Sequence, residues 1–219
     1  MNILPRVLKL DINTKGNDFV VGDIHGELPK LVKQLRDIGF DTSKDRLICV
    51  GDLIDRGPES AKTLDLLDKP WFFSVIGNHE SLMLSAMKYK NSSDRMLWLS
   101  HGGEWIASTS TSQWDDWFEK IEQLPLAIEV TNKDGKRYGI VHADFLSDHW
   151  NDIQDFSPDE VARCIWSRGS FKARSEHIVD GIDILVHGHN VVDEELHLGN
   201  RWYIEQGAFL GKDFIIKQL

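Results

Sequence analysis

The chain has 219 residues, of which 41% are hydrophobic, and its formal net charge is −10. This length suits one large domain or two small ones, and the apolar content is sufficient for a packed core. The acidic balance excludes a broad electrostatic surface for nucleic acid, although it remains compatible with a local basic pocket.

The first elements predict a strand, a polar loop and a helix. We expect residues 3–18 to form an opening pair of strands with a turn at residues 15–17, followed by a short buried strand at residues 19–21. Apolar residues recur at helical spacing over residues 28–38, and Gly39 is placed to end this helix.

Two further units repeat this plan. Residues 47–50 and 71–76 predict strands, each followed by a polar loop and a helix. Ser60 is a candidate N-cap for the helix over residues 60–67, and a third helix is expected over residues 82–87. Three consecutive units with short connections predict a parallel sheet that is flanked by helices and joined by right-handed crossovers.

The second half of the chain does not continue the repeated strand, loop and helix units. Tryptophans set among Ser, Thr and Gly indicate a mostly helical cap at residues 91–124. Further strands are expected at residues 127–130, 138–141, 184–186, 202–204 and 214–217, with one helix at residues 159–166. Since no linker or long repeat separates these segments, we expect a single domain over residues 1–219.

The two cysteines indicate in which cellular compartment the protein is found. Cys49 and Cys164 both lie in apolar sequence, and their spacing indicates neither a disulfide framework nor a thiolate zinc site. Pro5, Arg6 and Lys9 interrupt the first apolar residues, so we predict no secretion signal and no membrane-spanning segment. We therefore expect a cytoplasmic protein with buried thiols.

Polar clusters follow five of the expected strands, namely Asp23 with His25, Asp52 with Asp55, Asn78 with His79, His142, and His189. Ligands of open α/β sheets bind beyond the carboxyl ends of the strands, so we expect these clusters to converge on one crevice. Oxygen and imidazole donors without thiolate suit manganese, iron(II) or zinc.

The number of these donors suits two metal ions. Asp52, in the middle of the set, could bridge both ions, and a pair about 3.5 to 4 Å apart stabilises the attacking and leaving oxygens of a displacement at phosphorus. Arg56 and Arg168 are candidates to hold the phosphoryl oxygens.

Five motifs in order carry a family resemblance: Gly22-Asp23-Ile24-His25-Gly26, Gly51-Asp52-Leu53-Ile54-Asp55-Arg56-Gly57, Gly77-Asn78-His79-Glu80, His142-Ala143-Asp144 and Gly188-His189. Together they resemble the phosphoprotein phosphatase family of binuclear metallophosphoesterases, and most closely the small bacterial and bacteriophage-lambda-type Ser/Thr phosphatases. The likeness runs from about Phe19 to Phe214 and includes lesser matches at Trp98–Trp105 and Cys164–Arg168.

The resemblance implies a calcineurin-like α/β sandwich, in which mixed sheets are flanked by helices around a βαβαβ metal-binding core. It implies that one metal is bound by Asp23 and His25, that Asp52 bridges, and that the second is bound by Asn78, His142 and His189. His79 would be the general acid, oriented by Asp55, and Arg56 and Arg168 would bind the phosphate.

The implied reaction is in-line attack of a metal-bound hydroxide on a phosphomonoester, with protonation of the leaving oxygen by His79. Manganese is the expected metal, with Fe2+ or Zn2+ as alternatives. Phosphoserine and phosphothreonine in proteins or peptides are the expected substrates, with phosphotyrosine as a further one. We expect no nucleic-acid or membrane partner, and a monomer.

One departure keeps a second function open. The phosphatases often carry a basic residue two positions before the Asn-His-Glu, where this chain has Ile76. The symmetrical dinucleoside tetraphosphate hydrolases are similar in having an aliphatic residue there, although this chain is short for that group and its cap resembles the lambda-type enzymes. A third alternative is a metal-dependent binding module without catalysis, although every acid and ligand is present.

Several residues keep two interpretations. Strand alternation alone does not distinguish His187 from His189 as a ligand, and the Gly-His match favours His189. His101 either contacts substrate or caps its loop. Glu80 and Asp144 either orient the ligating histidines or serve a helix start and a turn. Aromatic residues mostly fill cores, and only Trp105 and Trp150 are candidates to touch substrate.

Overall fold

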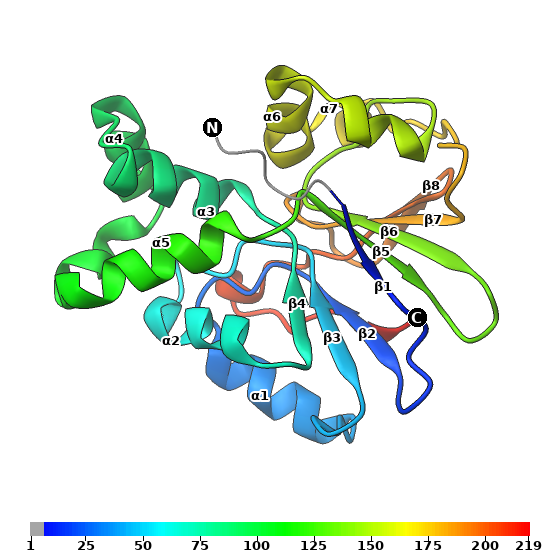
Figure 1. Cartoon of the computed structure of the whole chain (residues 1–219), viewed down its shortest axis with the longest axis horizontal. Coiled ribbons are helices and arrows are strands. Elements are labelled where there is room, and N and C mark those ends of the chain that lie inside the picture. The colour runs from blue at the N-terminus through cyan, green and yellow to red at the C-terminus, as the bar shows by residue number, and fades with distance from the viewer. Residues whose placement is uncertain (1–6) are drawn as a thin grey trace.

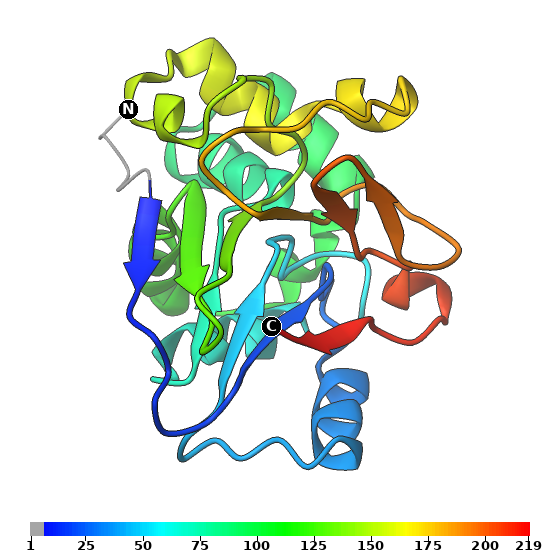
Figure 2. The same ribbon diagram turned by 90° about the vertical axis from the view of Figure 1, so that its right-hand side faces the viewer.

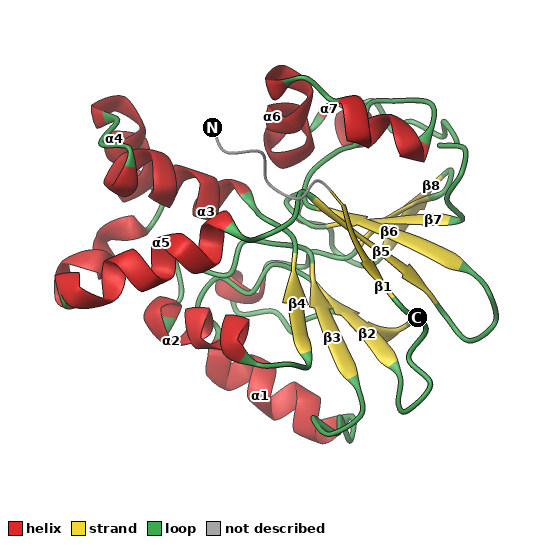
Figure 3. Ribbon diagram, in the orientation of Figure 1, coloured by secondary structure: helices red, strands yellow, loops and turns green. Residues whose placement is uncertain are grey.

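The computed structural model describes residues 7–219 and contains two β-sheets packed face to face with helices on the outside (Figures 1 and 3). The smaller sheet has the order β10-β2-β3-β4. Strands β2 (Asp18–Val21), β3 (Arg46–Cys49) and β4 (Phe72–Ser74) are parallel, as predicted from the three repeated units. Strand β10 (Ile216–Gln218) runs antiparallel beside β2 (Figure 2).

The larger sheet has the order β1-β5-β6-β7-β9-β8 and mixes parallel with antiparallel pairs. Its strands are β1 (Val7–Leu10), β5 (Ala127–Thr131), β6 (Arg137–Val141), β7 (Ile184–His187), β8 (Leu196–Leu198) and β9 (Arg201–Tyr203). The predicted opening strand pair is wrong, because β1 pairs with β5 and β2 lies in the other sheet. Residues 3–6 of that prediction lie outside the described residues.

An apolar core fills the space between the two sheets. Val20 and Ile48 of the smaller sheet and Ile128, Ile140 and Val186 of the larger one are fully buried in it. The other faces of the sheets pack under the helices in a second core. Strands that are buried on both faces require nearly continuous apolar sequence, which is the pattern that residues 19–21 and 47–50 show.

The helices are α1 (Leu28–Asp37), α2 (Ser60–Leu64), α3 (Asn78–Met83), α4 (Ser92–Ser100), α5 (Trp114–Glu122), α6 (Pro158–Trp166) and α7 (Gly169–Lys172). The helical prediction for residues 91–124 is confirmed by α4, α5 and two short 3-10 turns between them. Ser60 is not the N-cap of α2, because Glu59 takes that position and Ser60 Oγ accepts a hydrogen bond from Asp55 N at 2.9 Å. No helix of the described residues is long and apolar enough to cross a membrane.

The topology brings the polar loops to one edge. The three parallel strands β2, β3 and β4 end on the same side, and so do the parallel strands β6 and β7 of the other sheet. The loops that follow these five strands carry all the polar clusters predicted from the sequence. The two sheets therefore present them to a common crevice.

Candidate active site

A pocket of about 200 Å³ lies where these loops meet. It is lined by Asp23, Asp52, Arg56, Asn78, His101, Trp166, Arg168, His189, Val191 and Phe209. The structure thus brings together acids, imidazoles, an amide and two arginines from segments that are far apart in the sequence.

Asp52 occupies the centre of the ligand set. Its Oδ2 atom lies 3.4 Å from His142 Nε2 and 3.7 Å from His25 Nε2. Two groups of side chains share this carboxylate: His25, Asp52 and His79 form one, and Asp52, His142 and His189 form the other. Within each group the candidate ligand atoms lie within 4.8 Å of one another.

The remaining predicted ligands adjoin these groups. Asn78 Oδ1 lies 3.0 Å from His142 Nε2, and Asp23 Oδ2 lies 4.0 Å from His25 Nε2. The carboxylate of Asp23 also accepts the backbone N–H of His189 at 3.0 Å. All six predicted ligands therefore surround one small volume.

The orientation of the imidazoles fits metal binding. His25 Nδ1 donates to Ile54 O at 2.9 Å and His142 Nδ1 donates to Val50 O at 2.8 Å, so in each ring Nε2 is the atom that faces the predicted ligand set. Among the described residues, the buried Nε2 atoms of His79 and His189 have no hydrogen-bond partner. Buried polar atoms are normally paired, so a metal or substrate atom would satisfy these two.

The loop backbone holds strained conformations at the site. Five of the seven non-glycine residues with positive φ in the described chain are His25, Asp52, Asp55, Arg56 and His189. Such conformations persist where the surrounding structure fixes them, and they cluster at functional sites. Glu80 supplies part of this fixation, because its carboxylate accepts the N–H groups of Asp52 at 3.0 Å and Leu53 at 2.8 Å.

Among the described residues, the hydrogen bonds that Glu80 and Asp144 accept come from backbone N–H groups and Ser167 rather than from a histidine. Glu80 also accepts Gly77 N at 3.0 Å, at the start of α3. Asp144 accepts Phe145 N and Ser170 N, at 2.8 and 3.0 Å. Of the two interpretations from the sequence, the structure favours the helix start and the turn.

Charge is concentrated between Asp52 and His142. Burial raises the pKa of Asp52, but the neighbouring His142 and His79 outweigh it and hold the pKa well below its usual value. Burial lowers the pKa of His142, but Asp52 outweighs it and raises the pKa to about 9. A divalent cation between these side chains would displace the proton that His142 carries.

His79 and Asp55 form a close pair. His79 Nδ1 lies 2.6 Å from Asp55 Oδ2, and both side chains are buried. Burial lowers the pKa of His79, but Asp52 and Asp55 outweigh it and raise the pKa above its usual value. A protonated imidazole beside the central carboxylate is suited to donate a proton. The indoles of Trp98 and Trp105 also donate to Asp55, which the sequence did not indicate.

Both predicted arginines reach the pocket. Arg56 Nη1 lies 2.7 Å from His25 Nε2, and its guanidinium stacks on Phe209 with Cζ 4.3 Å from the ring centroid. Arg168 Nη1 donates to the carbonyl of His189 and to Asn190 Oδ1, each at 3.0 Å. Sequence reasoning missed Phe209, which lies in no polar cluster, and Asn190, which follows His189 but falls outside the matched Gly188-His189 motif.

The residues that kept two interpretations have different outcomes in the structure. His101 lines the pocket, and its Nδ1 also donates to Leu97 O at 2.8 Å, so both of its interpretations hold geometrically. His187 lies outside the ligand groups, with its ring stacked on Tyr203. Trp150 is buried and donates to Glu129, so it is not a candidate to touch substrate. Ile76 is buried and does not line the pocket.

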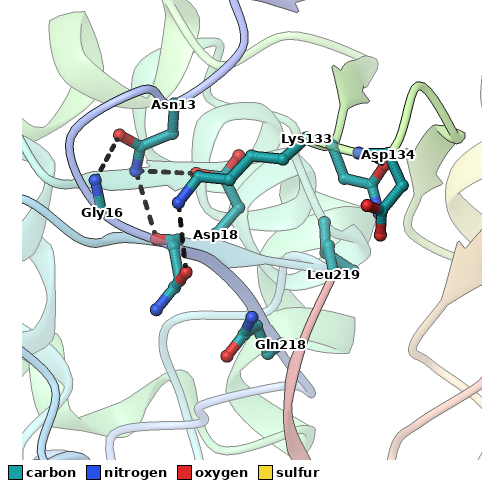
Figure 4. A pocket seen from close by; sticks show the side chains of 9 residues that line it. Asn13, Gly16, Asp18, Lys133, Asp134, Gln218 and Leu219 are labelled. Atoms are coloured by element: carbon teal, nitrogen blue, oxygen red, sulfur yellow. Dashed lines mark hydrogen bonds between the residues drawn. The ribbon is translucent and has the colours of Figure 1, made fainter.

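A second pocket, of about 240 Å³, lies away from all these side chains, among residues from the loop before β2, the turn after β5 and the end of β10 (Figure 4). Its central polar group is Asn13, whose amide donates to Lys44 O at 3.0 Å and whose Oδ1 accepts Gly16 N at 3.0 Å. Because these bonds form the turn itself, we assign the chemistry to the smaller pocket.

Comparison with known proteins supports that assignment. The model of the calcineurin-like phosphoesterase family matches residues 19–193, and the chain belongs to this family. It is 37% identical over 198 residues to serine/threonine-protein phosphatase 2 of Salmonella typhimurium, covering 87% of each chain. It is 35% identical over 210 residues to serine/threonine-protein phosphatase 2 of Escherichia coli, covering 93% of each.

Dinucleoside tetraphosphatases match less of the chain. The symmetrical bis(5'-nucleosyl)-tetraphosphatase of Coxiella burnetii is 39% identical over 79 residues, which are 35% of this chain and 26% of that protein. Among solved structures, a candidate diadenosine tetraphosphatase superposes over 98% of both chains with a TM-score of 0.70 at 22% identity. A Saccharomyces cerevisiae serine/threonine phosphatase gives 0.66 at 16% identity, covering 92% of this chain and 71% of that one. At these identities the structures show the fold alone.

Proposed function

We propose that this protein is a metal-dependent protein serine/threonine phosphatase, a phosphoric monoester hydrolase, that also acts on phosphotyrosine. The observation that carries the proposal is the arrangement in which Asp52 lies among the predicted ligands Asp23, His25, Asn78, His142 and His189, beside the His79–Asp55 pair and two arginines. The bacterial phosphatases that match almost the whole chain support a phosphoprotein substrate.

In this proposal Asp23 and His25 would hold one metal ion, Asn78, His142 and His189 would hold the other, and Asp52 would contribute to both. The mixed oxygen and imidazole donors suit manganese, with Fe2+ or Zn2+ as alternatives. When bound, such ions act as Lewis acids and lower the pKa of a coordinated water.

The protein side chains perform the remaining steps. Arg56 and Arg168 bind the phosphoryl oxygens by charge-assisted hydrogen bonds and hold the phosphorus in line. Asp55 holds Nδ1 of His79, so that the proton for the leaving oxygen comes from Nε2. Serine and threonine alkoxides are poor leaving groups, so this proton transfer is required for their release.

A symmetrical dinucleoside tetraphosphate hydrolase is the second candidate. The aliphatic Ile76 and the partial match to the Coxiella burnetii tetraphosphatase favour it. The larger coverage of the protein phosphatases weighs against it.

We also propose that residues 1–219 form one catalytic domain, with residues 91–124 as its cap, and that the protein is a monomer. We propose a cytoplasmic location, which the two buried free cysteines support.

The test is a side-by-side rate comparison with manganese. We expect phosphate release from p-nitrophenyl phosphate and from a phosphoserine peptide, and slower cleavage of diadenosine tetraphosphate. Faster cleavage of the dinucleotide would establish the second candidate instead. If neither phosphomonoester is hydrolysed with manganese, iron(II) or zinc, the proposed function is wrong.

A further inference from the structure

The Asp55 carboxylate receives three N–H donors although it has no exposed surface. His79 Nδ1 lies 2.6 Å and Trp98 Nε1 2.8 Å from its Oδ2 atom. Trp105 Nε1 lies 2.6 Å from its Oδ1 atom. A buried carboxylate is costly unless its oxygens are paired, and the indoles supply two of the three partners.

The two indoles come from the helical segment that precedes α5. Trp98 lies on α4, and Trp105 lies on the 3-10 turn at Gly103–Ser108. Their rings meet edge-on at 6.3 Å, and Trp105 also rests on Trp117 of α5, with ring centroids 5.6 Å apart. Both rings are therefore fixed by packing as well as by their hydrogen bonds.

Two glycines permit this close approach. A Cβ atom on Gly103 would lie 2.5 Å from the Trp98 ring, and one on Gly102 would lie 2.6 Å from the backbone N of Arg56. Gly102 also has a φ of +103°, which L side chains rarely adopt. The chain between the two tryptophans is thus shaped to lie against Asp55 and Arg56.

We propose that Trp98 and Trp105 are positioning residues for the catalytic acid, because their indole N–H groups fix the Asp55 carboxylate that orients His79. The role rests on the proposed function. An indole N–H is a donor that never accepts and does not ionise near neutral pH, so each indole can bond the carboxylate in one sense only. Burial raises the pKa of Asp55, and the hydrogen bonds from His79, Trp105 and Trp98 oppose that rise.

The leaving group separates this role from a purely structural one. Expulsion of a serine alkoxide requires the proton from His79, whereas p-nitrophenolate is stable enough to leave without it. Loss of an indole donor should therefore slow the phosphoserine peptide much more than p-nitrophenyl phosphate. A general loss of structure would slow both alike.

The experiment compares Trp105→Phe and Trp98→Phe with Trp114→Phe. Trp114 is a matched control, because its indole donates to Thr109 Oγ1 at 2.9 Å within the same segment and away from Asp55. For Trp105→Phe we expect kcat on the phosphoserine peptide to fall about tenfold, the value for one hydrogen bond to a charged group. We expect KM and bound metal to stay unchanged, kcat on p-nitrophenyl phosphate to change less than about threefold, and Trp114→Phe to match the wild type.

The choice of Trp105 and a double variant with Asp55→Asn distinguish the possible outcomes. Trp105 is partly exposed and tolerates replacement better than the fully buried Trp98, so the result does not depend on folding of the second variant. In an Asp55→Asn background, Trp105→Phe should cause no further fall on the peptide. An equal loss on both substrates, or an equal loss in Trp114→Phe, would overturn the role while leaving the proposed function intact. A wild-type protein that hydrolyses neither substrate would overturn both.

Discussion

The ring of Phe209 lies under the guanidinium of Arg56, with Cζ 4.3 Å from the ring centroid. The same ring meets the imidazole of His25 edge-on at 4.9 Å. Lys30 of α1 donates to Lys212 O at 2.8 Å and so anchors the segment that carries Phe209. An aromatic face restrains a guanidinium without using its N–H donors, so the Arg56 donors other than the one at His25 Nε2 remain available for phosphate.

We therefore expect Phe209→Leu to weaken phosphate binding. A cation–π contact contributes about 1 kcal/mol, so KM and the inhibition constant of inorganic phosphate should each rise about fivefold. Steady-state kinetics with p-nitrophenyl phosphate measure both, and kcat should change less than about twofold. Leu210→Ala is the control, because Leu210 is the next residue and is 64% exposed. Unchanged phosphate inhibition in Phe209→Leu would contradict the role.

Asp52 and Asp55, which both lie in the loop after β3, should respond differently to replacement by asparagine. Asp52→Asn removes the charge that both ligand groups share, so bound metal should fall well below that of the wild type. Asp55→Asn lies outside both groups and should keep its metal while turnover of a phosphoserine peptide falls. Elemental analysis after desalting measures the metal. Equal metal loss in both variants would show that Asp52 has no special place in the site.

His79→Asn tests the acid and the non-catalytic alternative together. Loss of a general acid costs about 100-fold or more, so turnover of a phosphoserine peptide should fall by at least that factor. Metal content should stay near that of the wild type, because all six proposed ligands, namely Asp23, His25, Asp52, Asn78, His142 and His189, remain in this variant. If the protein were a binding module, the wild type would have no activity for this change to remove. Unchanged turnover would exclude His79 as the acid.

Local sequence predicted the parts of the site that follow strands. Asp52 and His79 stand in polar loops behind apolar runs, and parallel strands bring such loops to one edge. Phe209 could not be predicted in this way, because its partner Arg56 is distant in the sequence and a single aromatic residue between Ala208 and Leu210 carries no pattern. The indole bonds of Trp98 and Trp105 depend on the geometry of a 3-10 turn that residue spacing does not fix.

The strand errors have a similar cause. β1 pairs in parallel with β5, which lies more than a hundred residues further along the chain, and nothing local distinguishes that partner from the adjacent β2. The missed strand β8 is three residues long and has an exposed histidine in its centre, so it shows no clear alternation. Pairing between distant strands is decided by packing of the whole sheet rather than by local propensity.

Glycine at two loop positions should be required for the metal site. A Cβ atom on Gly77 would lie 2.1 Å from Asp52 Oδ1, and one on Gly188 would lie 2.1 Å from Asp23 Oδ1. We expect Gly77→Ala and Gly188→Ala to lower metal content and to destabilise the fold by about 1–3 kcal/mol. Gly169→Ala is the control, because its nearest atom would be Ser167 Oγ at 3.2 Å. Wild-type metal content in both loop variants would contradict the geometry.

Glu129, which lies outside the active site, should make the free energy of unfolding depend on pH. Burial raises its pKa, but hydrogen bonds from Trp150 and Arg137 outweigh it and lower the pKa below 4.5. In the unfolded chain the pKa returns to about 4.5, so the unfolded state takes up the proton first as the pH falls. The stabilisation from Glu129 is therefore fully present at neutral pH and is lost as the pH falls from about 4.5 through the lowered pKa.

Glu129→Gln should accordingly lower the midpoint of urea unfolding at neutral pH, because the glutamine loses the charge-assisted bond from Arg137, 3.0 Å long in the wild type. The difference from the wild type should shrink as the pH is lowered below about 4.5, where the wild-type carboxylate also becomes neutral. Glu119→Gln on the exposed face of α5 controls for the general effect of removing an acid. A difference between wild type and Glu129→Gln that stays constant down to about pH 3 would show that the ionised carboxylate does not stabilise the folded state.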